Sequence, residues 1–136
     1  MIYENPNNPL PSVEYLFSII NETEFSIQDA YGTNKVLIAE AHLTLHNAKN
    51  GQPYGVEVTF RDEERSQFFN LHLNGQHSLF PITYYLLFGG ETVIAGVPLD
   101  WTELSSNTPN LRSIEVTGIQ ETLAELAPAG QYRDTI

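Results

Sequence analysis

Residues 36–46 constrain the fold of this chain most, because hydrophobic and polar side chains alternate strictly from residue 39 onward. Successive side chains of a β-strand point to opposite faces, so this alternation predicts a strand with one buried and one solvated face. Such strands are typical of antiparallel sheets, which often pack only one face on the core. The expected buried set is Ala39, Ala41, Leu43 and Leu45, and the expected solvated set is Glu40, His42, Thr44 and His46.

Shorter segments of the same kind recur along the chain, separated by turn residues such as Asn50-Gly51, Asn74-Gly75 and Gly89-Gly90. Many short strands at regular spacing favour an all-β, antiparallel sandwich or a barrel. Pro81 is expected to mark an edge or a bulge. Strands are expected within 13–20, 25–27, 36–46, 56–60, 69–73, 79–88, 92–94, 97–101, 111–119 and 130–136, with a helical turn or two at 121–127.

The size and composition fit one domain, since 136 residues with 41% hydrophobic residues are enough to fill a core. We expect an extended N-terminal arm at 1–12, which contains Pro6, Pro9 and Pro11, followed by a single β-sandwich domain at 13–136. The chain has no cysteine, which excludes thiol catalysis, a disulfide framework and a cysteine-ligated zinc site.

The net charge of −11, with only six lysine and arginine residues, narrows the choice of partners. Nucleic acids and anionic membranes would repel such a surface, so we expect neither as a ligand. The longest hydrophobic stretch, around Tyr84 to Phe88, is too short to span a bilayer, so membrane insertion is not expected. A partner with a basic patch would suit the charge.

Few residue patterns point to chemistry. His42 and His46 share one face of the predicted strand, and His72 belongs to another strand. Residues four apart on a strand lie roughly 13 Å apart, so His42 and His46 are too distant to bind one metal ion. The run Asp62-Glu63-Glu64 lacks the pattern of a calcium loop and predicts a solvated hairpin turn. No nucleophile elbow or phosphate-binding glycine loop is present. We therefore expect a protein that is not an enzyme and has no cofactor or metal site.

Aromatic residues are the more promising binding groups. Tyr84 and Tyr85 should point to opposite faces of one strand, and Trp101 lies near a loop. Tyrosine and tryptophan can stack on sugars or anchor a protein interface. We nevertheless predict that Tyr84 and Trp101 belong to the core.

The C-terminal run 127–136 is the most distinctive motif, and it reads Ala-Pro-Ala-Gly-Gln-Tyr-Arg-Asp-Thr-Ile from Ala127 to Ile136. It resembles the last strand of bacterial pilus subunits assembled by the chaperone–usher pathway, most closely the branch that includes the spore coat protein U domain. Segments 54–60 and 82–90 are similar to strands of such domains, although many relatives carry a cysteine pair that this chain lacks. The matching positions are Pro128, Ala129, Gly130, Tyr132, Asp134, Thr135 and Ile136.

The resemblance implies an incomplete immunoglobulin-like sandwich that lacks its final strand. A periplasmic chaperone, and later another pilus subunit, would supply that strand to the open groove, making this chain a structural or adhesive subunit. The resemblance also places Gly130, Tyr132, Asp134 and Ile136 along one wall of the groove. The N-terminal arm is the usual donor strand, but its prolines are poor ladder donors, which favours a tip subunit that only accepts a strand.

Two other functions remain open. The chain is alternatively a carbohydrate- or protein-binding β-sandwich module, with a host molecule or glycan as ligand, or a small-barrel enzyme that uses His42, His46 or His72. The start of the chain carries no secretory signal. The expected location is the extracellular surface, reached through the periplasm, if a signal sequence has been removed, and the cytoplasm if the chain is complete.

Overall fold

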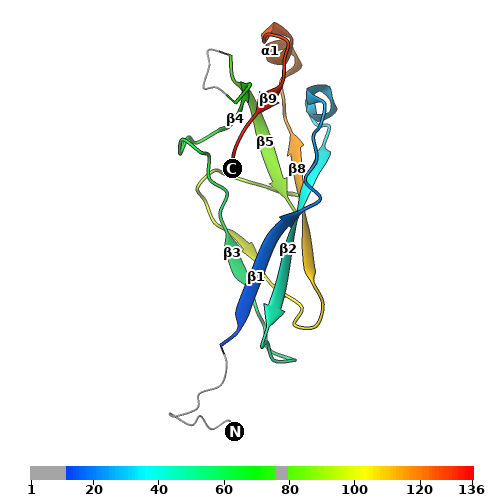
Figure 1. Ribbon diagram of the computed structural model, residues 1–136, viewed down its shortest axis with the longest axis vertical. Coiled ribbons are helices and arrows are strands. Elements are labelled where there is room, and N and C mark those ends of the chain that lie inside the picture. Colours follow the sequence, from blue (N-terminus) through cyan, green and yellow to red (C-terminus); the bar gives the residue numbers. More distant parts are fainter. Residues whose placement is uncertain (1–11, 76–79) are drawn as a thin grey trace.

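Antiparallel β-strands dominate the computed structural model, which describes residues 12–75 and 80–136 (Figure 1). The named strands all pair antiparallel, and an isolated parallel bridge joins Tyr31 to Ile119. The predicted all-β fold is confirmed. The expected arm at 1–12 lies, apart from its last residue, outside the described residues.

One large sheet and one small sheet form the two layers. The large sheet has the order β1 (Glu14–Ile20), β2 (Val36–His46), β8 (Asn110–Thr117), β5 (Ile82–Phe88), β4 (Phe69–Leu73) and β9 (Tyr132–Arg133), with β6 (Glu91–Thr92) also paired to β5. The small sheet pairs β3 (Val56–Val58) with β7 (Leu99–Trp101). A 3-10 helix, η1 (Ile27–Ala30), and the short α1 (Glu121–Leu126) complete the elements.

The core fills the space between the two sheets. The alternation predicted for β2 is confirmed, because Ala39, Ala41, Leu43 and Leu45 are all buried. Phe88 at the end of β5 is fully buried and makes edge-to-face contacts with Trp101 of β7 and with Phe60, which follows β3. The prediction that Tyr84 and Trp101 are core residues is also confirmed.

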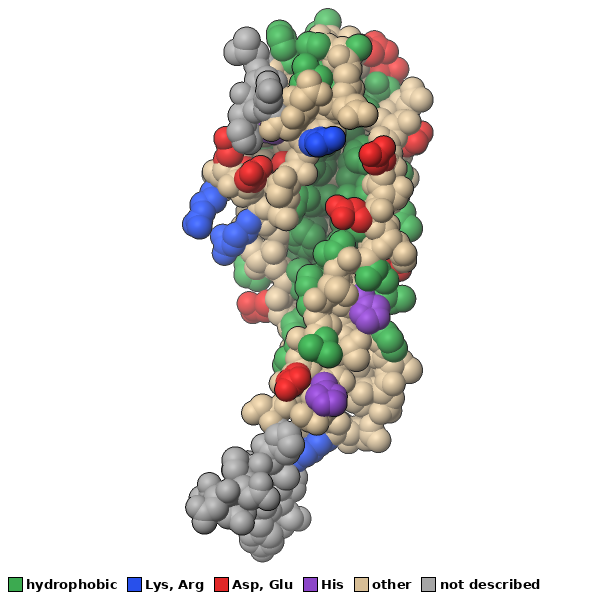
Figure 2. Space-filling view, in the orientation of Figure 1, with side chains coloured by type: hydrophobic (Ala, Val, Ile, Leu, Met, Phe, Trp, Pro, Cys, Tyr) green, Lys and Arg blue, Asp and Glu red, His purple; other side chains and the backbone are tan. Residues whose placement is uncertain are grey.

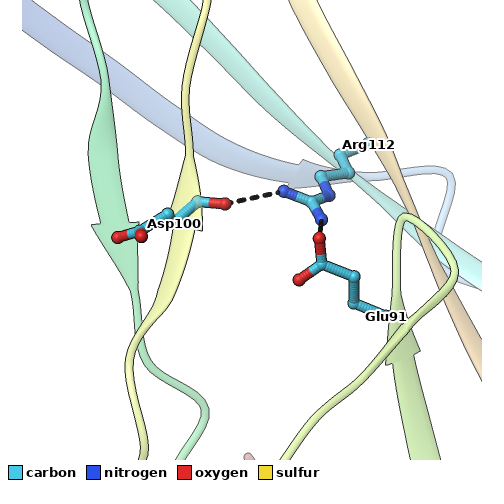
Figure 3. A network of polar contacts seen from close by, with 3 residues as sticks. All are labelled: Glu91, Asp100 and Arg112. Atoms are coloured by element: carbon cyan, nitrogen blue, oxygen red, sulfur yellow. Dashed lines mark hydrogen bonds and ion pairs between the residues drawn. The ribbon is translucent and has the colours of Figure 1, made fainter.

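Arg112 lies on the core face of β8, where it pairs directly with the buried Ala41. Its side chain connects the two layers by reaching Glu91 and the backbone of Asp100 (Figure 3). Its guanidinium group donates a hydrogen bond of 3.1 Å to the backbone oxygen of Asp100 and lies 3.3 Å from a carboxylate oxygen of Glu91. The same group lies over the Phe88 ring, 4.4 Å from its centroid. The guanidinium therefore makes two polar contacts while it packs on the buried Phe88 ring.

Three local predictions need correction. Residues 25–27 are not a strand: the chain enters η1 at Ile27, where it buries Ala30 completely. The segment 130–136 forms only the two-residue strand β9, not a strand along its whole length. Pro81 marks neither an edge nor a bulge, because β5 begins at the next residue and the missing proline N–H therefore interrupts no ladder. The helix predicted at 121–127 is confirmed as α1.

Candidate functional site

Strand β1 carries a row of hydrophobic side chains on the face that the sheet turns toward the core. Tyr15, Phe17 and Ile19 are directly opposite Leu45, Leu43 and Ala41 of β2. Directly paired residues of antiparallel strands point to the same face of the sheet. The three side chains of β1 therefore extend the core surface by one more strand.

The second layer does not cover this row. Phe17 is 52% exposed, whereas Leu43 beside it is 1% exposed, and Tyr15 and Ile19 are likewise nearly half exposed. Leu16, on the opposite face of β1, is 56% exposed. The core-facing side chains are thus buried on β2 and exposed to solvent on β1.

β1 is also an unprotected sheet edge. It pairs with β2 over all seven of its residues without a register shift, and among the described strands it has no partner on its other side. Proteins usually protect a sheet edge with lysine, proline, a bulge or a very short strand. β1 contains no lysine and no proline, whereas the edge strands β9 and β3 have only two and three residues. Its unpaired backbone groups can therefore bind another strand.

Figure 2 shows the open face as a hollowed band of hydrophobic side chains along the long axis of the molecule. In this view the band lies between β1 on one side and β3 with the C-terminus on the other, as comparison with Figure 1 shows. Hydrophobic surface in contact with water costs free energy in proportion to its area, roughly 25 cal/mol per Å². Covering the band with another chain would be favourable.

The four residues predicted as a groove wall lie at the other end of the large sheet, around β9. Tyr132 pairs with Leu73, and its hydroxyl donates to the backbone oxygen of Pro128 at 2.5 Å. Gly130 packs so closely that an added Cβ would lie 2.5 Å from a methyl carbon of Leu73. Ile136 is 51% exposed. Tyr132 and Gly130 therefore hold the C-terminal segment to β4, and the hydrophobic side chain of Ile136 is exposed to solvent at its end.

Asp134 anchors the same segment to the core. It accepts a hydrogen bond of 2.5 Å from the Tyr84 hydroxyl and another from the backbone N–H of Thr135. Burial raises the pKa of the Asp134 carboxyl above its ordinary value, although the hydrogen bond from Tyr84 opposes that shift. Burial and the nearby Asp134 carboxylate also raise the pKa of Tyr84, which therefore stays protonated and serves as the donor.

The histidines considered for metal binding do not meet. His42 and His46 lie on β2, and His72 lies on β4, which is separated from β2 by two strands. In the part of the chain that the structure describes, no three histidine or acidic side chains gather as a metal site would require. The described residues also contain no helix long and apolar enough to cross a membrane.

The acidic turn at 61–65 differs from the solvated hairpin expected there. Asp62 is only 7% exposed, and its carboxylate accepts hydrogen bonds from the backbone N–H groups of Glu64 and Ser66. Arg65 takes the left-handed backbone conformation that this tight turn needs. Asp62 is therefore a structural residue that shapes the turn.

β1 is the candidate binding element that the sequence did not predict. The segment was expected to be a strand, but its edge position was not foreseen. One available signal was the presence of hydrophobic residues on both faces, Leu16 and Ile20 as well as Phe17, in a strand without lysine or proline. Searches of protein-family models, curated proteins and solved structures found no match to this chain.

Proposed function

We propose that this chain is a structural subunit of a bacterial surface pilus that completes its sandwich with a β-strand from another chain. The observation that carries the proposal is the exposure of Phe17 and its neighbours Tyr15 and Ile19 on the core face of an unprotected edge. A strand added beside β1 would pair with its free backbone groups and place alternate side chains next to this row, on the same face of the sheet.

The C-terminal run supports the more specific assignment to pili. Residues 128–136 resemble the last strand of chaperone–usher subunits, whose sandwiches are completed by a donated strand. Asp134 and Tyr132 hold that segment in place, and Ile136 leaves an exposed hydrophobic side chain at its end. In this proposal a periplasmic chaperone is the first donor and another subunit is the second, at the cell surface.

A donor-peptide experiment on the full chain tests strand acceptance. The probe is a seven-residue peptide with isoleucine or valine at every second position, and the readout is thermal unfolding. Binding to the folded state alone raises the melting temperature by mass action. We expect the peptide to stabilise the chain strongly, since an unfilled edge leaves the isolated protein weakly stable.

Two substitutions in β1 make the test specific. Phe17→Thr removes a side chain from the core-facing row, and Leu16→Thr removes an equally exposed one from the opposite face. Threonine favours strands, so both variants should keep β1. The peptide should stabilise the Leu16→Thr chain and fail with Phe17→Thr. If the chain is a folded monomer and no strand peptide changes its melting temperature, strand acceptance is refuted.

A second candidate function, carbohydrate binding, rests on Tyr85. This residue is 47% exposed and borders an open depression of about 500 Å³ that also includes Lys35 and Thr117. An aromatic ring beside hydroxyl and ammonium groups can hold a sugar by stacking and hydrogen bonds. A glycan array probed with the chain and with Tyr85→Ala tests it: a hit that the substitution abolishes supports it, and an array without hits refutes it.

A further inference from the structure

We propose that the strand accepted at β1 belongs to a different protein and carries lysine or arginine at both of its ends. This inference rests on the proposed function, strand acceptance at β1, and adds the chemistry of the partner. It follows from the positions of the charges around the open edge.

The strands around the hydrophobic band carry acidic residues and no lysine or arginine, and the two histidines of β2, His46 and His42, lie opposite Glu14 and Ser18. β1, β2, β3 and β7 contain Glu14, Glu40, Glu57 and Asp100, and none of them contains lysine or arginine. Two more carboxylates, Glu22 and Glu24, follow β1 and are exposed. Arg112, the nearest cation on β8, is held by Glu91 and the Asp100 backbone oxygen. The four strands themselves therefore carry only negative formal charge, and the lysines that flank β2 in the chain, Lys35 and Lys49, lie beyond its two ends.

The charges on the outer face of β1 fall at its two ends. Glu14 begins the strand, and Glu40 lies directly opposite Ile20, the last residue. The positions between them on that face are Leu16 and Ser18, which carry no charge. A strand lying beside the free edge of β1 would thus have Glu14 on the neighbouring strand at one end and Glu40 one strand further away, across Ile20, at the other end. Lysine or arginine at its ends would be attracted to these carboxylates, as a direct neighbour of Glu14 and across one strand to Glu40.

A second copy of this chain suits the edge poorly. Each copy has a net charge of −11, and two copies would bring their acidic edges together. Such repulsion keeps proteins monomeric and steers them toward partners of opposite charge. The charge distribution therefore favours a basic strand from another protein over pairing between two β1 strands.

The test compares two seven-residue peptides that share a hydrophobic face and differ at the ends of the other face, one with lysine and one with glutamate. Fluorescence anisotropy gives the dissociation constant of each labelled peptide for the full chain. We expect the lysine peptide to bind about tenfold more tightly at about 0.05 M salt, because two attractive pairs replace two repulsive ones. The difference should largely vanish at about 0.5 M salt.

Matched variants locate the effect. The double variant Glu14→Gln/Glu40→Gln should remove most of the preference for lysine while both peptides still bind. The control Glu121→Gln/Glu125→Gln changes the net charge equally but on α1, and it should leave the preference intact. A preference that survives in the first variant, or disappears in the control, would overturn the assignment to Glu14 and Glu40.

The remaining outcomes separate this inference from the proposed function. Equal, salt-insensitive binding of the two peptides would overturn the basic partner and leave strand acceptance standing. Failure of both peptides at every salt concentration would overturn strand acceptance, and the inference with it. Sedimentation that shows the unliganded chain as a dimer, with Phe17→Thr monomeric, would assign the edge to a second copy and overturn the inference.

Discussion

The hydroxyl of Tyr84 donates a hydrogen bond of 2.5 Å to a carboxylate oxygen of Asp134, which lies fifty residues later in the chain. This contact joins the C-terminal segment to β5, a strand in the interior of the large sheet. Since β9 itself has only two residues, the side-chain contact replaces the backbone ladder that a longer strand would provide. The attachment of the C-terminal segment to the sheet should therefore depend on pH.

Stability should fall as pH rises through the titration of Asp134. Its folded pKa is raised above the ordinary value of 3.8, so the folded state favours the protonated carboxyl. The stability that this group contributes is then complete below pH 3.8 and is lost as pH rises through the folded pKa. Urea unfolding across this range should show a declining difference in free energy between the native chain and Asp134→Asn.

Tyr84→Phe supplies the control for that prediction. The hydrogen bond from Tyr84 lowers the pKa of Asp134, so its removal should raise that pKa further and extend the decline to higher pH. A profile unchanged by Tyr84→Phe would contradict the role assigned to this contact. In a double-mutant cycle at neutral pH the two residues should show a coupling energy of about 1 kcal/mol.

Arg112→Met should destabilise the sandwich by about 1–3 kcal/mol, because it removes the hydrogen bond to Asp100 and the cation–π contact with Phe88 while keeping the hydrophobic stem. Chemical unfolding measures the change. Glu91→Gln removes only the ion pair, and Glu91 is 59% exposed, so its effect should stay below about 1 kcal/mol. Equal effects of the two substitutions would show that the ion pair, and not the packing on Phe88, accounts for the stabilisation by Arg112.

Gly118→Ala should destabilise the chain more than Gly51→Ala does. Both glycines have positive φ, so alanine is strained at either position. At Gly118 the added Cβ would also lie 2.2 Å from a ring carbon of Tyr85, whereas at Gly51 it would meet nothing within 4 Å. Thermal unfolding of both variants gives the comparison, and indistinguishable melting temperatures would argue against close packing of the Tyr85 ring on this turn.

A peptide with the sequence of residues 1–12 should fail as a donor strand. Pro6, Pro9 and Pro11 each lack the N–H that a ladder bond needs. Added to the full chain, this peptide should leave the melting temperature unchanged under conditions in which the isoleucine peptide raises it. A comparable rise with both peptides would restore the N-terminal arm as a donor for a neighbouring copy.

Alternation along the chain was enough to predict the fold class and much of the core. The pattern of β2 alone identified Leu43 and Leu45 as buried, because the period of two is imposed by strand geometry. Which strand lies at an edge depends on pairing between distant segments, and this information is absent from local pattern. Residues 13–20 show hydrophobic side chains on both faces of the strand, but only the strand order of the folded sheet shows that Phe17 lies exposed at an edge.

The contacts of the C-terminal segment were beyond prediction for a related reason. The sequence marks Asp134 as part of a motif, but its partner Tyr84 lies on a strand whose distance in space is set by the whole sheet. The prediction of a solvated turn was wrong for Asp62 for the same reason. A carboxylate in an acidic run is usually solvated, but this one is buried and accepts hydrogen bonds from backbone N–H groups of its own turn. Both cases depend on tertiary contacts.

The irregularity in β2 has a consequence for the size of what can bind at the edge. The register between β2 and β8 shifts between Leu37 and Ala39, just beyond Glu40, where the pairing with β1 ends. The seven paired residues of β1 offer an incoming strand an edge about 24 Å long, at roughly 3.4 Å per residue. Affinity should grow with each residue added to an incoming strand up to that length and then level off. The length of β1 therefore sets the length of the partner strand that binds best.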